Sequence, residues 1–395
     1  MDKLNKNNEP SILVVAFNRP SSLISLLESL ESAHYENQVR LIISIDGGGG
    51  ELNDTVKNIA RNYQWPNGEK IIIMHEENLG LRNHILKAGN LTQKYGDIIM
   101  LEDDLYVSKL YYSYSKQALD YYRDENSIAG ISLYAQQYNE TSGKPFYPLY
   151  SESDTYFMQL ASSWGQAWTK EQWGDFFEWY KDNESNILEE NWIPSNIKKW
   201  PSTSWKKYFI KYLIEKEKFF VYPYISLTTN MRAKGVHAKI SDNLLQVPMY
   251  FAIDKKFSFA DFESSVIKYD AFHENINLSQ IISIENLKNI QADLYGTKNI
   301  EGAEYVLTSK ALNFKILRKY GLRMVPHELN VLNDIKGDDL FLYYTKDKQK
   351  FSEDKKWNIE YRNFIYYFLK VNPGKRRIVK HFINTIINKI FNLKN

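Results

Sequence analysis

One stretch, Asp97-Ile-Ile-Met-Leu-Glu102-Asp103-Asp104-Leu105, indicates the fold most clearly. Its apolar residues 98–101 predict a buried strand, and three carboxylates follow directly. Adjacent carboxylates repel one another and cost stability unless a cation or hydrogen-bond donors offset them. A hard divalent ion, Mg²⁺ or Mn²⁺, prefers a few carboxylate oxygens together with substrate phosphates. The stretch therefore predicts a metal site at a strand end; the alternative is a solvated acidic loop before a helix near Ser108.

Strands and helices alternate in the residues that precede this stretch. Apolar runs predict strands at 12–17, 39–45 and 70–75, and helical periodicity predicts helices at 20–30, 53–63 and 81–95. Such alternation is typical of parallel βαβ units. We therefore expect an α/β fold with a mostly parallel sheet flanked by helices, followed by a mixed or helical C-terminal extension.

Polar residues also follow the other predicted strands. Arg19, Asp46 and His75 each come just after a strand, and ligands of such sheets bind beyond the carboxyl ends of the strands. Arg19 could pair with phosphate or stack on a base, and Asp46 could accept hydrogen bonds from a ribose or a base edge. The alternatives are a surface arginine, a turn aspartate before glycine, and a strand-end histidine for His75.

Composition excludes several classes of protein. The 395 residues include 50 Lys and Arg against 48 Asp and Glu, so a basic nucleic-acid-binding protein is not expected. Cysteine is absent, which excludes disulfides, thiolate metal sites and a cysteine nucleophile. The first ten residues are polar, and no apolar run reaches the roughly 18 residues that span a bilayer. We expect a cytoplasmic protein.

Tryptophan is concentrated in residues 145–240, which hold seven of the nine. Among them is Ser162-Ser-Trp164-Gly165-Gln-Ala-Trp168. Aromatic faces stack on the C–H faces of sugar rings, although the same rings can equally form a core.

The strand ending in Asn-Arg-Pro, the Ser-Ile-Asp-Gly strand end, the His-x-x-Asn-Leu-Gly segment and Leu-Glu-Asp-Asp-Leu together resemble a GT-A glycosyltransferase. Within that class the chain is similar to N-acetylglucosaminyltransferase I-like enzymes and to bacterial family-2-type transferases of surface polysaccharide assembly. The resemblance covers 11–240. It implies that Arg19 and Asp46 contact the nucleotide and that His75 lies near the diphosphate. It further implies the roles of the acidic stretch: Glu102 and Asp103 touch the ribose and sugar, and Asp104 binds the metal.

The same resemblance extends to two later segments. The Trp-Gly-x-x-Trp stretch would border the donor sugar and acceptor through Trp164, Gly165 and Trp168. Asn230-x-x-x-x-Gly235-x-His237 is similar to the loop that closes the donor site, with His237 facing the metal or diphosphate; the alternative is an exposed loop histidine. These segments define a catalytic domain at 1–240, with a donor half at 11–130 and an acceptor half at 131–240.

The residue that would act as the catalytic base is less clear. An inverting transferase needs a carboxylate to take the proton of the acceptor hydroxyl. The acidic aromatic motif of N-acetylglucosaminyltransferase I is not visible, since the matching stretch reads Trp200-Pro-Ser-Thr-Ser-Trp205-Lys-Lys. Asp175 is the leading candidate, with Asp154 and Glu178 as rivals; each could instead be structural.

The C-terminal third divides into two regions. Residues 241–370 form an accessory region whose architecture the sequence does not indicate. Residues 371–395 predict a basic amphipathic helix, because its Lys and Arg residues accompany an apolar stripe of Ile, Val and Phe at spacings near four. Its part at 373–395 could lie on the inner face of an anionic membrane, dock on its own domain, or pair two copies in a homodimer.

These observations lead to one principal expectation. We expect a metal-dependent glycosyltransferase that moves a hexosyl or N-acetylhexosaminyl group, with inversion, from a nucleotide-diphosphate donor. The donor would be a UDP-sugar, the metal Mn²⁺ or Mg²⁺, and the acceptor a glycan or lipid-linked saccharide in bacterial surface polysaccharide synthesis. The alternatives are a sugar-1-phosphate nucleotidyltransferase and a non-catalytic glycan- or membrane-binding subunit of the same fold.

Overall fold

The computed structural model divides the chain into two compact units. One comprises residues 1–283 with 297–299, and the other comprises 284–296 with 300–395. The structure describes residues 9–185, 190–231, 245–282, 287 and 289–351, together with 356, 362, 363, 366, 367 and 383. Each unit is described by itself.

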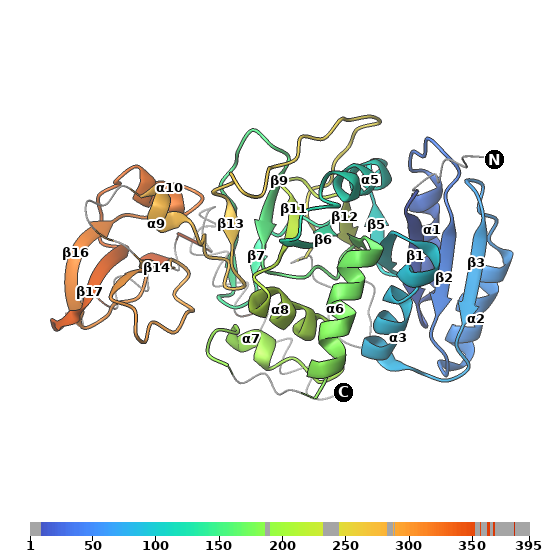
Figure 1. Cartoon of the computed structure of the whole chain (residues 1–395), viewed down its shortest axis with the longest axis horizontal. Coiled ribbons are helices and arrows are strands. Elements are labelled where there is room, and N and C mark those ends of the chain that lie inside the picture. Colours follow the sequence, from blue (N-terminus) through green and yellow to red (C-terminus); the bar gives the residue numbers. More distant parts are fainter. Residues whose placement is uncertain are drawn as a thin grey trace. The chain divides into compact units, whose positions relative to one another are not determined.

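The first unit is built on a nine-stranded sheet in the order β13-β9-β11-β6-β10-β4-β1-β2-β3 (Figure 1). Four neighbouring strands run parallel, which confirms the predicted α/β fold: β1 (Ser11–Ala16), β2 (Leu41–Ile45), β3 (Lys70–Met74) and β4 (Ile98–Glu102). β1, β2 and β4 are buried almost throughout, which explains their nearly continuous apolar sequences.

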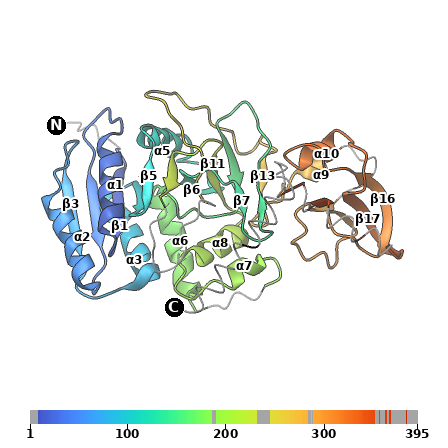
Figure 2. The ribbon, with the colours of Figure 1, turned by 180° about the vertical axis from the view of Figure 1, so that it is seen from behind.

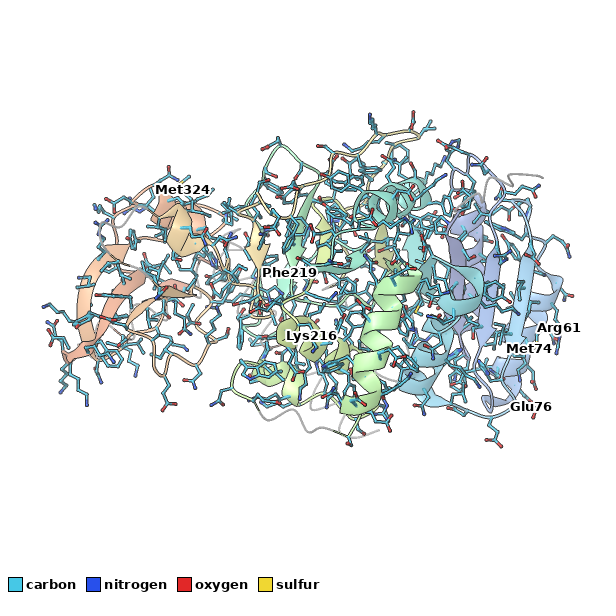
Figure 3. The ribbon with its side chains drawn as sticks, in the orientation of Figure 1. Arg61, Met74, Glu76, Lys216, Phe219 and Met324 are labelled. Carbon is cyan, nitrogen blue, oxygen red and sulfur yellow. The ribbon has the colours of Figure 1, made fainter. Side chains whose placement is uncertain are left out.

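Helices connect these strands. α1 (Pro20–Glu31) begins at a proline and packs its leucines inward, and α2 (Gly50–Asn62) contacts α1. Arg61 of α2 lies against Met74 of β3, with its Nη2 donating to the sulfur at 3.4 Å (Figure 3). The predicted third helix is divided into α3 (Gly80–Gly89) and the short α4 (Thr92–Tyr95). The connection from β3 back to β4 reverses the strand order, so right-handed crossovers place α3 on the face opposite α1 and α2.

The register of the strands determines where the polar strand ends lie. Ala16 pairs with Ile45, Ile45 with Met74, and Val15 with Glu102. The residues that immediately follow β1, β2, β3 and β4 therefore emerge at one edge of the sheet. We call it the carboxyl edge, and the opposite one, where these strands begin, the amino edge.

The other half of the sheet is mixed. β10 (Gln166–Trp168) runs antiparallel to β4 and to β6 (Ile128–Ser132), and β11 (Phe219–Pro223) is parallel to β6. β9 (Thr155–Met158) and β13 (Lys268–Tyr269) complete it, so residues assigned by sequence to the accessory region contribute a strand to the main sheet.

Two helices in this half lie side by side in both views of the ribbon (Figures 1 and 2). α6 (Lys170–Asn183) begins with a capping box in which Thr169 accepts from the Gln172 N–H, and α8 (Lys206–Glu215) packs against it through Phe176 and Phe209, whose rings are 4.0 Å apart. The smaller elements are α5 (Tyr111–Tyr121), α7 (Ser195–Lys198), α9 (Leu278–Ile281), the pair β5 (Leu105–Val107) and β12 (Thr228–Asn230), and the pair β7 (Tyr138–Asn139) and β8 (Lys144–Pro145).

The second unit holds a four-stranded sheet in the order β14-β15-β17-β16. Its strands are β14 (Ile290–Asp293), β15 (Tyr305–Thr308), β16 (Phe314–Tyr320) and β17 (Leu340–Lys348), with α10 (Glu328–Leu332) beside them in sequence. Among the described residues, no helix is long and apolar enough to cross a membrane. The predicted helix at 371–395 lies outside the described residues apart from Ile383.

Candidate active site at the carboxyl edge

An arginine and two aspartates form the centre of the carboxyl edge. Arg19, which immediately precedes α1, places its Nη1 at 2.5 Å from Asp104 Oδ2 and 3.4 Å from Asp103 Oδ1. Asp103 also accepts the Phe17 N–H at 3.4 Å. The sequence expectation that Arg19 and the acidic stretch lie close together is met in the geometry, because β1 and β4 are adjacent and in register.

The three carboxylates of the acidic centre share one paired cation, Arg19, so negative charge is in excess. Burial and the neighbouring Asp104 and Asp103 raise the pKa of Glu102 to about 8, and burial raises that of Asp103 to about 6 although Arg19 opposes the shift. Among the described residues, Asp104 Oδ1 is buried and receives no hydrogen bond. An acceptor left in this state costs free energy unless a ligand satisfies it.

Asp46 is committed to the backbone around it. Its Oδ1 accepts from the N–H groups of Gly47 at 2.9 Å and Leu79 at 2.8 Å, and its Oδ2 accepts from Gly80 at 3.1 Å. Asn53 of α2 donates to the carbonyl oxygens of both Phe17 and Asp46. Three of the four lone-pair sites of the carboxylate are thus used to hold the start of α3 against the end of β2. The carboxylate of Asp46 therefore mainly stabilises the backbone at this edge, and only one of its lone-pair sites is left for a ligand.

Gly47 is required at this place because the backbone approaches closely. A Cβ there would lie 2.6 Å from the carbonyl oxygens of both His75 and Glu77. Gly47, the first residue of the glycine run 47–50, therefore allows a tight contact between the chain after β2 and the chain after β3.

His75 follows β3 and is partly exposed, with its ring edge-on to the buried His84 at 5.2 Å. Both rings approach the hydroxyl of Ser44, His84 at 2.8 Å and His75 at 3.4 Å. Burial lowers the pKa of His84 to about 4 and, with help from Lys87, also lowers that of His75. Neutral imidazoles at neutral pH follow from these shifts.

The Trp-Gly-x-x-Trp stretch divides between the edge and the core. Trp164 is partly exposed, and its ring lies 4.7 Å from that of Tyr134 and 5.0 Å from the Lys206 ammonium. Gly165 has φ +90° and would place a Cβ 2.9 Å from Thr228, so it holds the turn before β10. The prediction that Trp168 borders the sugar is wrong. Its side chain is fully buried, with its ring 4.7 Å from that of Trp173, because β10 places it opposite Ile98 at the start of β4. It packs the core and has no surface for a sugar.

The candidate bases do not join the acidic centre. Asp175 lies on α6 and pairs with Lys218, whose Nζ also donates to the Asn126 carbonyl. Asn126 and Lys218 precede β6 and β11, so this pair lies at the amino edge. Glu178 is exposed and pairs with Lys181 on the same helix.

Asp154 precedes β9 at the carboxyl edge, but four strands from β4, about 19 Å at the usual strand spacing. It pairs there with Lys255 at 3.0 Å. None of the three candidates is brought to Asp104 by the fold.

One lysine that sequence reasoning missed, Lys206, lies near the acidic centre. Lys206 begins α8 and lies over the rings of Trp164 and Trp200, at 5.0 and 5.1 Å. It is close enough to Glu102 to oppose the rise in that residue's pKa. The Trp-Lys-Lys sequence at 205–207 is the signal that could have found it, since a lysine on a buried aromatic face is unusual.

The segment that follows β12 leaves the sheet next to the acidic centre. The Met231 N–H donates to the Asp104 carbonyl at 2.9 Å, and the Tyr134 hydroxyl donates to the Leu245 carbonyl at 3.0 Å. The loop predicted to follow, with Gly235 and His237, lies outside the described residues.

The acidic centre offers a divalent metal only part of its ligands. Within the part of the chain that the structure describes, no group of three or more His, Asp or Glu side chains is arranged as a complete metal site. Asp104 Oδ1 is, however, a buried carboxylate oxygen without a donor. Mg²⁺ binds through one or two carboxylates when substrate phosphates and waters supply the other ligands. The residues present fit that kind of metal site.

Comparison with known proteins gives partial similarities. No known protein family matches the chain, and no curated protein matches its sequence. Among solved structures, TarS 1–349 of S. aureus with UDP-GlcNAc is 14% identical at a TM-score of 0.36, covering 59% of this chain and 61% of that one. The mannosyltransferase PcManGT of Pyrobaculum calidifontis, with GDP-Man and Mn²⁺, is 9% identical at 0.31, covering 49% and 51%. GalNAc-T7 with UDP, GalNAc and Mn²⁺ is 13% identical at 0.37, covering 55% and 43%.

The chain thus spans about half the length of these structures. What the carboxyl edge can bind follows from the chemistry of its own residues.

Proposed function

We propose that this protein is a metal-dependent glycosyltransferase that takes a sugar from a nucleotide-diphosphate donor, a UDP-sugar, and transfers it to a hydroxyl group of a saccharide. The observation that carries the proposal is the acidic centre itself. Three consecutive carboxylates lie at the end of a buried parallel strand, one arginine pairs with two of them, and a buried carboxylate oxygen has no donor among the described residues. A divalent ion would satisfy that oxygen and offset the excess negative charge of the carboxylates, and the donor's diphosphate would supply further ligands to the ion.

Asp104 would hold Mn²⁺ or Mg²⁺ through Oδ1. A bound divalent ion would offset the negative charge that develops on the departing nucleotide diphosphate. Arg19 uses only Nη1 in its hydrogen bonds within the described chain. Its other N–H groups are therefore free to donate to a phosphate oxygen in the same plane.

The remaining residues would position the donor. Asp46 holds the start of α3 against the end of β2, and His75 lies at the end of the neighbouring strand β3. Glu102 and Asp103 would contact the ribose and sugar, where a protonated Glu102 can donate a hydrogen bond as well as accept one. Trp164, partly exposed beyond Glu102, would stack on a sugar ring.

The wider role belongs to the same proposal. The acceptor would be a glycan or lipid-linked saccharide of bacterial surface polysaccharide synthesis, used at the inner face of the membrane. The basic, apolar sequence at 373–395 supports this location, because such helices bind anionic membrane surfaces. Transfer of a hexosyl or N-acetylhexosaminyl group with inversion is the reaction expected from the sequence resemblance.

A thermal-shift screen tests the proposal. The protein is heated with UDP, GDP, CMP or dTDP, each with Mn²⁺ and with EDTA, because a ligand that binds only the folded protein raises the Tm. We expect UDP with Mn²⁺ to give the largest rise and EDTA to abolish most of it. Asp104→Asn should remove the Mn²⁺-dependent part, whereas Asp120→Asn at the amino edge should not. A native protein whose Tm responds to no nucleotide would refute the proposal.

A further inference from the structure

The ammonium group of Lys206 is buried without an anion. Lys206 is only 9% exposed and lies between the indole rings of Trp164 and Trp200. Among the described residues it forms no ion pair and no hydrogen bond, and Glu102 is the carboxylate that feels its charge. Cation–π contacts offset part of the cost of burying an ammonium and leave its three N–H donors unused.

Two further cations continue the same surface. Lys207 donates from Nζ to the Trp200 carbonyl at 3.0 Å. Arg82 of α3 donates to the Tyr208 hydroxyl at 3.2 Å and lies over its ring. Arg82 lies close enough to Lys207 to help burial lower the pKa of that lysine. Within the described chain none of the three cations forms an ion pair with a carboxylate, and Arg82 and Lys207 repel each other.

The location of these cations separates them from the proposed diphosphate site. Arg19 and Asp104 belong to the ends of β1 and β4, whereas Lys206 and Lys207 begin α8, in the half of the unit that follows β5. Glu102 feels the charges of both Arg19 and Lys206, and the Trp164 ring lies 5.0 Å from the Lys206 ammonium. A ligand here would meet aromatic faces together with unpaired cations. Sugar rings suit the faces, and phosphate or carboxylate groups suit the cations.

We infer that Lys206, Lys207 and Arg82 bind an anionic group of the acceptor, so the acceptor is a saccharide that carries phosphate or carboxylate. The inference rests on the proposed function, because it names the class of acceptor at the same site. A neutral acceptor would leave the Lys206 ammonium buried and unpaired. An anionic one forms charge-assisted hydrogen bonds with it in a partly desolvated place, where they are strong.

Matched saccharides provide the test. Glucose 6-phosphate, glucuronic acid and glucose share a ring and differ in charge, and isothermal titration measures each on the UDP- and Mn²⁺-loaded protein. At least one of the two anionic sugars should bind about ten-fold or more tightly than glucose, with an advantage that falls as salt rises. The tighter of the two identifies phosphate or carboxylate as the preferred group. Equal binding of all three would overturn the inference.

Variants assign the effect to residues. Lys206→Met keeps most of the aliphatic stem and should remove the advantage of the anionic sugar, and Lys206→Arg should restore it. The double variant Arg82→Met with Lys207→Met should lower the affinity advantage of the anionic sugar several-fold. Because both residues are partly exposed, this variant tests the inference even if Lys206→Met does not fold. Lys216→Met is the control, since Lys216 directly follows the last residue of α8 and is exposed; it is labelled in Figure 3.

The donor is titrated separately. UDP affinity should be the same in native protein and Lys206→Met within about two-fold. If Lys206→Met weakens UDP as much as it weakens the anionic sugar, Lys206 serves the donor diphosphate and the inference fails. If the native protein binds no UDP, the proposed function fails instead.

Discussion

The two edges of the main sheet carry similar charge clusters with different consequences. At the amino edge, Arg123 Nη2 lies 2.7 Å from Asp97 Oδ2 and 3.1 Å from Asp120 Oδ1. At the carboxyl edge, Arg19 Nη1 contacts Asp104 and Asp103 in the same one-to-two arrangement. The amino-edge cluster can relax into solvent, because the Asp120 side chain is 52% exposed.

The carboxyl-edge cluster is not exposed to solvent in this way. Its two aspartates have side chains only 9% and 14% exposed, and Glu102 adds a third carboxylate. Burial and mutual repulsion raise the pKa of Glu102 and of Asp103 as a result. An arginine between two aspartates thus has a relaxed, partly exposed setting at one edge and a buried one with excess negative charge at the other, and the proposed function assigns a metal and a diphosphate to the second. Four predictions probe this difference.

The largest effect should come from replacing one arginine-paired aspartate at each edge with asparagine. Asp104→Asn should lower the rate of UDP release from the donor sugar on the order of 100-fold or more, because it weakens the group that would hold the metal at the leaving diphosphate. Thermal unfolding should change little. Asp97→Asn should instead cost about 1–3 kcal/mol of stability, because it weakens the hydrogen bond between the buried Asp97 side chain and the partly buried Arg123, and turnover should be nearly unchanged.

The measurements are steady-state release of UDP and denaturant unfolding, made on both variants together. Reversed results, with Asp97→Asn inactive and stable, would mean that the functional edge has been misassigned.

The second prediction concerns the turn that supports the carboxyl edge. Asp46→Ala leaves three backbone N–H groups without their acceptor, and we expect it to cost about 3 kcal/mol or more. The matched control is Asp54→Ala on α2, whose side chain is 74% exposed. A fall in UDP affinity with native stability would mean that Asp46 contacts the nucleotide directly and is not mainly a support.

Local sequence patterns predict the carboxyl edge well. The alternation of apolar runs with helical periods determines which strands are parallel, and parallel strands bring residues such as Arg19, Asp46 and Asp104 to one edge. The edge therefore follows from four short segments without any long-range contact having to be known.

Side-chain direction and distant pairing are not available from such patterns. Trp164 and Trp168 are four residues apart, yet the antiparallel strand β10 places one at the site and the other in the core. Asp175 reaches Lys218 only because α6 and α8 pack together. The Lys206 contact with Trp164 joins residues whose proximity likewise depends on tertiary packing.

The third prediction uses the pKa of Glu102. The pKa is raised in the folded protein, so between about pH 4.5 and 8 the unfolded chain loses a proton that the folded chain keeps. Stability therefore falls as pH rises through this window. Glu102→Gln removes that loss. In EDTA it should match the native protein near pH 4 and become more stable by about 1.4 kcal/mol or more at pH 8, the equivalent of one pKa unit.

Parallel denaturant titrations of the two proteins at several pH values give the difference directly. Glu125→Gln serves as a control at the amino edge, before β6. A difference between native protein and Glu102→Gln that does not change with pH would mean that Glu102 is not held in its protonated form.

The smallest effect is expected at Asp175, the candidate base from sequence. Its side chain is 61% exposed and its ion pair with Lys218 spans 3.4 Å, so Asp175→Asn should change stability by less than about 0.5 kcal/mol. The five residues of β4 separate the two edges by about 16 Å, too far for Asp175 to take a proton at Asp104. Turnover should stay within about two-fold of native, assayed beside Asp104→Asn. A folded Asp175→Asn variant as inactive as Asp104→Asn would show that the amino edge participates in the chemistry, and the division between the two edges would no longer hold.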